Sequence, residues 1–162
     1  MPRAAILSDT HLRDGRPLPP GCAELARGCD LVIHAGDFSD AVAVAAVRAL
    51  GPPLAAVHGN VDSTEVQRLL GEEETVELGG RAISIVHDAG PAKGRLVRLR
   101  RRFPDADAVV FGHSHMPLLE TEDGFAIFNP GSPTQRRRAP RHTMGLLEAD
   151  DVKLRFRHID LD

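Results

Sequence analysis

Short, mostly apolar runs recur along the chain, and each is rich in Val, Ile, Leu or Ala. They are Ala4–Leu7, Leu31–Ile33, Leu54–Val57, Ala82–Val86 and Ala108–Phe111. Apolar runs of this length are typical of strands that are buried on both faces. The pattern therefore predicts a series of buried strands that begins almost at the first residue.

Helical patterns separate several of these runs. The segment Ser39–Leu50 has an interior of Ala and Val, a capping Ser39 or Asp40, and a Gly-Pro-Pro sequence after it. Two further helices are expected over Ser63–Leu70 and Gly94–Phe103. Because strands alternate with helices, the pattern favours crossover connections and a largely parallel sheet.

The pattern changes after Phe111. Strands separated by turns are expected at Phe125–Phe128, Met144–Glu148 and Val152–His158, so a β-rich end follows the α/β part. No internal linker interrupts the chain, and its 162 residues fit one domain spanning 1–162. The fold class is therefore predicted to be α/β.

Composition narrows the function. The formal net charge of −3 argues against a general nucleic-acid or membrane-surface protein. Trp and Tyr are absent, which disfavours a protein that binds single strands by stacking their bases. The eight His residues are the unusual feature, because His is the commonest metal ligand and a frequent acid–base group.

The two cysteines, Cys22 and Cys29, are expected on one short helix. Seven residues of helix span about 10.5 Å, which exceeds the reach of a disulfide. Two free thiols favour a reducing compartment, and no secretory leader or membrane-length apolar run is evident, so we expect a cytoplasmic protein without a membrane partner.

Polar residues of the kind found in metal sites follow each of the five predicted strands. These are Asp9 and His11, His34 and Asp37, His58 and Asn60, His87, and finally His113 and His115. Ligands bind beyond the carboxyl ends of strands in open α/β sheets. We therefore expect these groups to point into one crevice.

The residue types indicate the chemistry. In extended backbone, residues two apart point the same way, so Asp9 with His11 and His113 with His115 can each grip one site. Imidazole, carboxylate and amide ligands suit borderline metals such as Mn²⁺, Zn²⁺, Fe and Co²⁺. Seven such groups suffice for two ions about 3.5–4 Å apart that share one carboxylate.

The blocks Asp9-Thr10-His11, Gly36-Asp37, Gly59-Asn60, His87 and Gly112-His113-Ser114-His115 resemble the signature of the calcineurin-like metallophosphoesterase superfamily. The short length and Asn129-Pro130-Gly131-Ser132 are similar to its small prokaryotic phosphodiesterase branch. The resemblance implies a single-domain, two-sheet αββα sandwich with metals at the strand ends.

The same resemblance implies the roles of the ligands. Asp9, His11 and His115 would hold one metal, and Asn60, His87 and His113 the other, with Asp37 bridging both. Asp37, Asn60 and His113 would be catalytic, and a hydroxide between two divalent ions would attack phosphorus in line. Mn is the first choice of metal, with Zn, Fe, Ni, Co or Mg as alternatives.

Two positions depart from the family pattern. Many members carry His directly after the Asn, where this chain has Val61, and that leaves the general acid unassigned. In the small prokaryotic branch His87 is usually followed by Gly, where this chain has Asp88, which adds a charge beside the second metal.

Other polar groups have several readings. His34 and Asp62 are candidates for bracing the ligands or their loops, and His58 for either that role or substrate contact as a substitute acid. Arg137 is a candidate for gripping substrate phosphate, although a subunit interface or a solvated loop would explain the cluster Arg136–Arg141 equally well. The cluster Arg95–Arg102 reads as the solvated face of a helix, with a nucleic-acid footprint as the minor alternative.

The favoured hypothesis is a metal-dependent phosphodiesterase that acts on a small phosphate ester. A phosphomonoesterase or nuclease using the same site is an alternative, with nucleic acid only as a substrate. A non-catalytic metal-binding scaffold of the same fold is another, and a homodimer or homo-oligomer is compatible with each.

Overall fold

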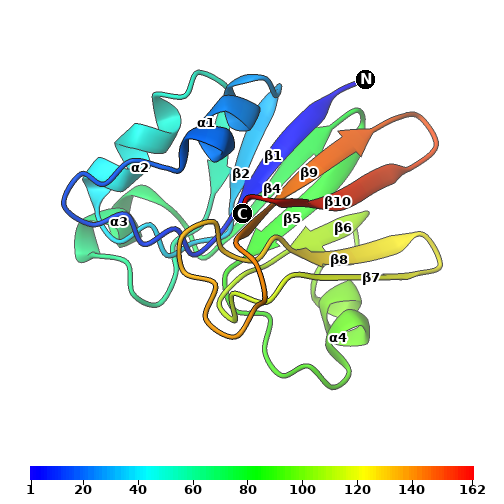
Figure 1. Cartoon of the computed structure of the whole chain (residues 1–162). Coiled ribbons are helices and arrows are strands. Elements are labelled where there is room, and N and C mark those ends of the chain that lie inside the picture. Colours follow the sequence, from blue (N-terminus) through cyan, green and yellow to red (C-terminus); the bar gives the residue numbers. More distant parts are fainter.

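The computed structural model describes residues 1–162 and contains two five-stranded sheets (Figure 1). The strands of the first sheet, in spatial order, are β10 (Leu154–Asp160), β9 (Thr143–Ala149), β1 (Arg3–Leu7), β2 (Leu31–His34) and β3 (Leu54–Ala56). Those of the second are β4 (Glu73–Leu78), β5 (Arg81–Val86), β6 (Ala108–Val110), β8 (Phe125–Asn129) and β7 (Leu118–Glu122).

Four short helices connect the strands, and their capping follows the sequence. They are α1 (Pro20–Arg27), α2 (Ala41–Arg48), α3 (Thr64–Leu69) and α4 (Arg95–Arg102). Asp40 caps α2 by accepting a hydrogen bond from Ala43, and Ser63 caps α3 by accepting one from Val66. No helix has the length and apolar character needed to cross a membrane.

The layers follow from three clusters of buried side chains. Leu7, Val32 and Leu146 pack on the side of the first sheet that α1, α2 and α3 cover (Figure 1). Its other face meets the second sheet, and the outer face of the second sheet is covered by α4. The αββα sandwich expected from the resemblance is therefore confirmed.

The predicted parallel pairing holds for the central strands, but both sheets are mixed. β1, β2 and β3 are parallel in the first sheet, and β5, β6 and β8 in the second, but antiparallel strands complete both. Strands β4 and β7 were not expected. They lie at the edges of the second sheet and are largely exposed, so they lack the apolar runs of buried strands.

Two local expectations also change. Cys22 lies in α1, but Cys29 lies beyond the end of that helix; both cysteines are buried and free. The arginines of α4 are not simply a solvated face, because the guanidinium groups of Arg95 and Arg100 lie over the rings of Phe111 and Phe125. Their stems and planar heads therefore cover apolar rings of the second sheet.

Candidate metal centre

The seven predicted ligands lie together where strands of both sheets end. Asp9 and His11 follow β1, and Asp37 and Asn60 follow β2 and β3 of the same sheet. His87 follows β5, and His113 and His115 follow β6, so three ligands come from the second sheet. The candidate centre therefore spans the junction between the sheets.

The backbone at the ligands differs from the extended form expected for Asp9 with His11 and for His113 with His115. These four residues, and Asp37 as well, have φ between 47° and 75°, in the left-handed region. Such residues occur in tight loops, where Asp and His tolerate this conformation better than bulkier types. The paired side chains are thus presented by strained turns, and the prediction from strand geometry is wrong.

Glycines allow the ligand loops to approach one another. A Cβ atom on Gly59 would lie 2.0 Å from Oδ1 of Asp37, and one on Gly112 would lie 1.9 Å from Oγ of Ser8. Neither glycine has a positive φ. Glycine is therefore required at these positions because the loops approach closely, and not because of the backbone conformation. Gly36 differs, because its φ of 101° strongly favours glycine.

One group of potential ligand atoms is formed by Asp9, His11 and His115. Nε2 of His115 lies 3.5 Å from Oδ1 of Asp9 and 3.4 Å from Nε2 of His11. Oδ2 of Asp37 lies 3.8 Å from the same His11 nitrogen. Asp9, His11 and His115 meet the spacing of a metal site, and Asp37 lies next to them.

A second group surrounds His87. Its Nε2 lies 2.9 Å from Oδ1 of Asn60 and 3.3 Å from Oδ2 of Asp37, and Nδ1 of His113 lies 3.1 Å from the same Asn60 oxygen. Oδ2 of Asp37 thus faces both groups. Asp9, Asp37 and His87 also meet the spacing of a metal site, so Asp9 lies near both groups as well.

A cation fits the orphaned oxygen of Asp9. Oδ2 of this buried carboxylate accepts hydrogen bonds from the Ser8 hydroxyl and the His113 N–H, whereas Oδ1 has no partner. Burial raises the pKa of Asp9, although the nearby charge of His87 opposes the rise. An unpaired buried carboxylate oxygen is costly, and a bound cation would supply the missing partner.

The histidines offer lone pairs to the same space. Nδ1 of His87 lies 2.7 Å from the carbonyl oxygen of Ala35, and Nδ1 of His115 contacts that of Gln135. A carbonyl oxygen only accepts, so each Nδ1 donates, and the neutral His115 ring keeps its Nε2 lone pair for a metal. Burial would lower the pKa of His87, but its contacts with Asp37 and Asp9 outweigh burial and raise it, so a metal bound at Nε2 of His87 would displace a proton. Burial lowers the pKa of His11 and His115, which favours the neutral form that binds metals.

The surroundings of Asp37 keep its carboxyl group ionised. Burial raises its pKa, but hydrogen bonding and charge from His87 and a hydrogen bond from the Val61 N–H outweigh burial and lower the pKa to about 2. The Val61 N–H binds Oδ1 at 3.1 Å, so Oδ2 remains directed toward the two ligand groups.

Asp62 lies behind the ligands and holds two of their loops. Its carboxylate accepts hydrogen bonds from the backbone N–H groups of Asp37, Ser39 and Gly59, at 3.0, 2.8 and 2.7 Å. Buried among neighbouring loops, it fixes where Asp37 and Asn60 leave their strands.

His34 is fully buried and lies 3.6 Å, centroid to centroid, from the ring of Phe38. The Gly36 N–H donates to its Nδ1, so its Nε2 carries the proton and donates to the Thr10 hydroxyl at 3.0 Å. His34 thus connects the β1 and β2 ligand loops without reaching either ligand group itself.

The two candidates for substrate contact lie near different ligand groups. His58 is half-buried and lines a hollow next to Asn60 and His87. Arg137 is exposed, has a φ of 49°, and its positive charge lowers the pKa of His11 and His115 after the larger effect of burial. Arg137 therefore belongs to the surroundings of the first ligand group.

Sequence reasoning gave no role to several residues that support the ligand loops. The Ser132 hydroxyl donates to the backbone oxygen of Asp9 at 2.8 Å, and that of Thr134 donates to Thr10 at 2.6 Å. The Asn129 amide donates to the Gly112 carbonyl and to the Ser114 hydroxyl, both at 3.2 Å. In the sequence, the motif Asn129–Ser132 marks two of these residues.

His142 lies next to the first sheet, and His158 lies in it. Nδ1 of His142 pairs with Asp162 at 2.7 Å, and His158 stacks on Phe128. Neither is among the groups of potential ligands.

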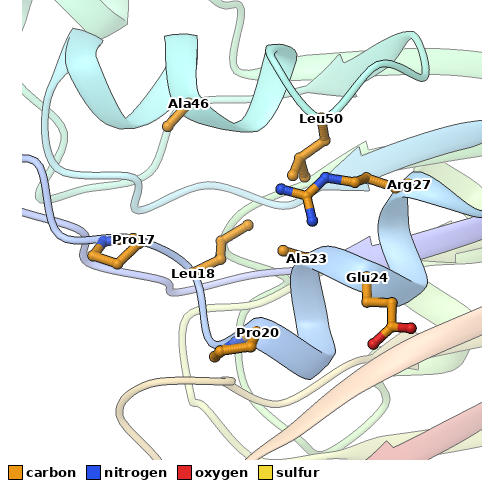
Figure 2. Close-up of a pocket in the computed structure, with 8 residues that line it drawn as sticks. All are labelled: Pro17, Leu18, Pro20, Ala23, Glu24, Arg27, Ala46 and Leu50. Atoms are coloured by element: carbon orange, nitrogen blue, oxygen red, sulfur yellow. The ribbon is translucent and has the colours of Figure 1, made fainter.

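Two hollows of the surface are large enough to be compared as substrate sites. One of about 300 Å³ adjoins the second ligand group and includes Asn60 and His87 in its wall. Another of about 500 Å³ lies between α1 and the end of α2, and Figure 2 shows Leu18, Ala46 and Leu50 around it. None of its lining residues is a candidate ligand, so the smaller hollow is the one connected with the centre.

Comparison with known proteins identifies the family. The model of the calcineurin-like phosphoesterase superfamily domain matches residues 3–152. A protein of Methanocaldococcus jannaschii named "Probable metallophosphoesterase" is 30% identical over 155 residues, which cover 93% of this chain and 78% of that protein.

Solved structures share the fold. Vps29 of Chaetomium thermophilum has a TM-score of 0.85 at 18% identity, covering 100% of this chain and 87% of that one. A structure described as a novel archaeal phosphodiesterase has a TM-score of 0.73 at 22% identity, with coverage of 97% and 99%. The extent of the family match and the identity to the archaeal relative show that this chain belongs to the calcineurin-like phosphoesterase superfamily.

Proposed function

We propose that this protein is a metal-dependent phosphodiesterase that uses two divalent cations. The observation that carries the proposal is the position of Oδ2 of Asp37, which lies 3.8 Å from Nε2 of His11 and 3.3 Å from Nε2 of His87. A single carboxylate oxygen thus faces both ligand groups, as a bridging ligand must.

The chain's own residues suit this use. Asp9, His11, Asp37 and His115 would hold one cation, and Asp37, Asn60, His87 and His113 the other. Mn is the proposed metal, with Zn, Fe, Ni, Co or Mg as substitutes, and the imidazole, carboxylate and amide ligands are compatible with it. When bound, such a pair activates water and neutralises charge on the phosphoryl oxygens.

Differences in exposure support one direction of approach for the substrate. Asp9 and His115 are buried, whereas Asn60 and His113 are exposed, so phosphate would approach from the side of the second ligand group. Asp37, Asn60 and His113 are the proposed catalytic ligands. The Arg137 guanidinium, which carries its charge near His11 and His115, would hold a non-bridging phosphate oxygen.

A diester is the favoured substrate class. Val61 follows Asn60 where many family members carry His, so no imidazole at that position can protonate a poor leaving group. A diester with a good leaving group needs that proton least, and the fold is shared with the archaeal phosphodiesterase. Phosphomonoesters and nucleic acids are the alternative substrates of the same site.

The test is hydrolysis of an activated aryl phosphodiester by purified protein, with Mn²⁺ added and with chelator. We expect activity with Mn²⁺ that chelator abolishes. Activity indifferent to chelator would refute the metal mechanism. Mn²⁺ bound at two equivalents without hydrolysis of any phosphoester would instead favour a metal-binding scaffold of the same fold.

A further inference from the structure

A polar hollow of about 300 Å³ adjoins the second ligand group, a volume near the lower end of small-molecule sites. Its wall is formed by Asn60 and His87 of that group together with Gly59, Val86 and five polar side chains: His58, Gln67, Glu72, Asp88 and Arg102. A molecule bound to the cation that Asn60 and His87 would hold could therefore extend into this hollow.

The polar side chains of the hollow come from separate parts of the fold. His58 follows β3, Gln67 lies on α3, Glu72 precedes β4, Asp88 follows β5, and Arg102 is the last residue of α4. These side chains are not the charged outer face of a single helix. They come from elements of both halves of the sandwich, which lie together at this hollow.

Two of these side chains are held by hydrogen bonds to the backbone. Nε2 of Gln67 donates to the Asp62 carbonyl oxygen at 3.0 Å, and Oδ1 of Asp88 accepts from the Gly90 N–H at 2.8 Å. These bonds leave Oε1 of Gln67 and Oδ2 of Asp88 as acceptors for a ligand. Positioned acceptors are a requirement for a selective pocket.

The hollow has an excess of negative charge. The Arg102 guanidinium pairs with Glu73, which is outside the lining, and its Nε donates to Oε1 of that residue at 2.9 Å. No ion pair involves Glu72 or Asp88. The carboxylates of these two residues therefore favour a cationic, hydrogen-bond-donating group.

The hollow offers little to an aromatic ring. Val86 is its one apolar residue, and no Phe lines it. Bases and aryl groups bind best where they stack on aromatic side chains, so this lining disfavours them. A short, flexible, donor-bearing group matches the lining better.

We propose that this hollow binds the amine-bearing alcohol of a phosphodiester, so that the substrate class is a diester of an amino alcohol such as ethanolamine. The inference rests on the proposed phosphodiesterase function. The phosphate would lie at the metal ligands, and the ammonium group would lie between the carboxylates of Glu72 and Asp88.

The test compares two chromogenic diesters that differ only in the amine: 4-nitrophenyl phosphoethanolamine and 4-nitrophenyl ethyl phosphate. For the Mn²⁺-loaded protein we expect kcat/KM to favour the amine by about tenfold, as for a charge-assisted hydrogen bond. The double variant E72Q/D88N should reduce that ratio to about threefold or less. Glu74→Gln, an exposed acid of β4 outside the lining, is the matched control and should keep the full ratio.

Binding gives a readout that does not depend on turnover. Isothermal titration of the Mn²⁺-loaded protein should show tighter binding of O-phosphoethanolamine than of ethyl phosphate, and E72Q/D88N should remove most of the difference. The single variants E72Q and D88N should each remove part of it, and both substituted side chains are exposed, so the fold does not depend on them.

The outcomes separate this inference from the proposed function. Equal kcat/KM for the two diesters, or a ratio unchanged in E72Q/D88N, would overturn the assignment of the hollow and leave the phosphodiesterase intact. Hydrolysis of neither diester would refute the phosphodiesterase, and the titration would still decide whether the hollow selects amines.

Discussion

The carboxylate of Asp62 accepts a hydrogen bond from the backbone N–H of Asp37 at 3.0 Å, although 25 residues separate them in the chain. Two further N–H groups, from Ser39 and Gly59, complete its contacts. Asp62→Asn places an amide donor where the chain needs an acceptor. We expect a loss of about 1–3 kcal/mol in the free energy of unfolding, measured by urea denaturation of the metal-free protein.

The same substitution should lower Mn²⁺ affinity, because the loops that carry Asp37 and Asn60 lose their common anchor. The expected loss is about 10–100-fold, typical of residues that orient metal ligands. Asp151→Asn, an exposed turn position, is the control. Unchanged affinity in Asp62→Asn would show that the loops hold their shape without this carboxylate.

Gly59→Ala should damage the centre without altering any ligand. Its Cβ would lie 2.0 Å from Oδ1 and 2.6 Å from the backbone nitrogen of Asp37, so Asp37 must move. We expect roughly 10–100-fold weaker Mn²⁺ binding, measured by metal titration. Gly21→Ala in α1 meets no atom within 4 Å, and there we expect a gain of about 0.5–1 kcal/mol in stability and normal metal binding.

Asp9→Asn should have opposite effects with and without metal. The substitution removes a buried carboxylate whose Oδ1 has no partner, and the new amide can donate to Nε2 of His115 nearby. In chelator we expect the variant to be about 1–2 kcal/mol more stable than the natural chain. With Mn²⁺ at about 100 times its Kd, the natural chain should gain about 2.7 kcal/mol and the variant little. Thermal unfolding of both proteins in both conditions measures this, and a variant that gains as much would exclude Asp9 as a ligand.

Acid should destabilise the metal-free protein through His34. Burial lowers the pKa of this imidazole to about 3, with further lowering by the charges of His87 and His11. Below about pH 6.5 the His34 side chain binds a proton in the unfolded chain but stays neutral in the folded protein. Unfolding therefore takes up a proton, and the free energy of unfolding decreases as the pH is lowered. The loss from this group should be about 2 kcal/mol between about pH 7 and about pH 5.

The comparison with His34→Gln isolates this contribution. Glutamine does not titrate, so the variant should lose about 2 kcal/mol less than the natural chain over that range. Urea denaturation in chelator at both pH values provides the measurement. Identical pH slopes for the two proteins would mean that His34 is protonated in the fold.

Arg137→Ala should raise KM for the activated diester. Its positive charge acts on His11 and His115, near the place where phosphate would bind. Loss of a charge-assisted hydrogen bond corresponds to roughly a tenfold effect on kcat/KM. Arg138→Ala is the matched control, since both side chains are exposed. Equal effects of the two substitutions would indicate general electrostatic attraction rather than a specific contact.

The sequence predicted the buried strands well, because strands covered on both faces are continuous apolar runs. It did not predict β4, where Glu73, Glu74 and Glu77 face solvent at a sheet edge. Nor could apolar runs alone divide the strands between two sheets. A parallel strand looks the same in either sheet, and only the resemblance supplied the second one.

For the candidate centre, the residue types were predictable and their presentation was not. Spacing suggested extended pairs, but Asp9 and His115 lie in left-handed turns that no periodicity reveals. The supporting contact of Ser132 depends on a loop more than a hundred residues from Asp9 meeting it in space, which local pattern cannot show. Whether the ligands hold metal stays a prediction.

The backbone of the ligand loops is held by groups outside the proposed metal ligands. Asp62, Ser132 and Asn129 bind it through hydrogen bonds to N–H and carbonyl groups, which any side chain at the ligand positions leaves available. Shape and chemistry are therefore separable here. A descendant that exchanged its histidines for inert residues would lose catalysis yet inherit a preformed concave surface, already rigid and free to acquire a different occupant.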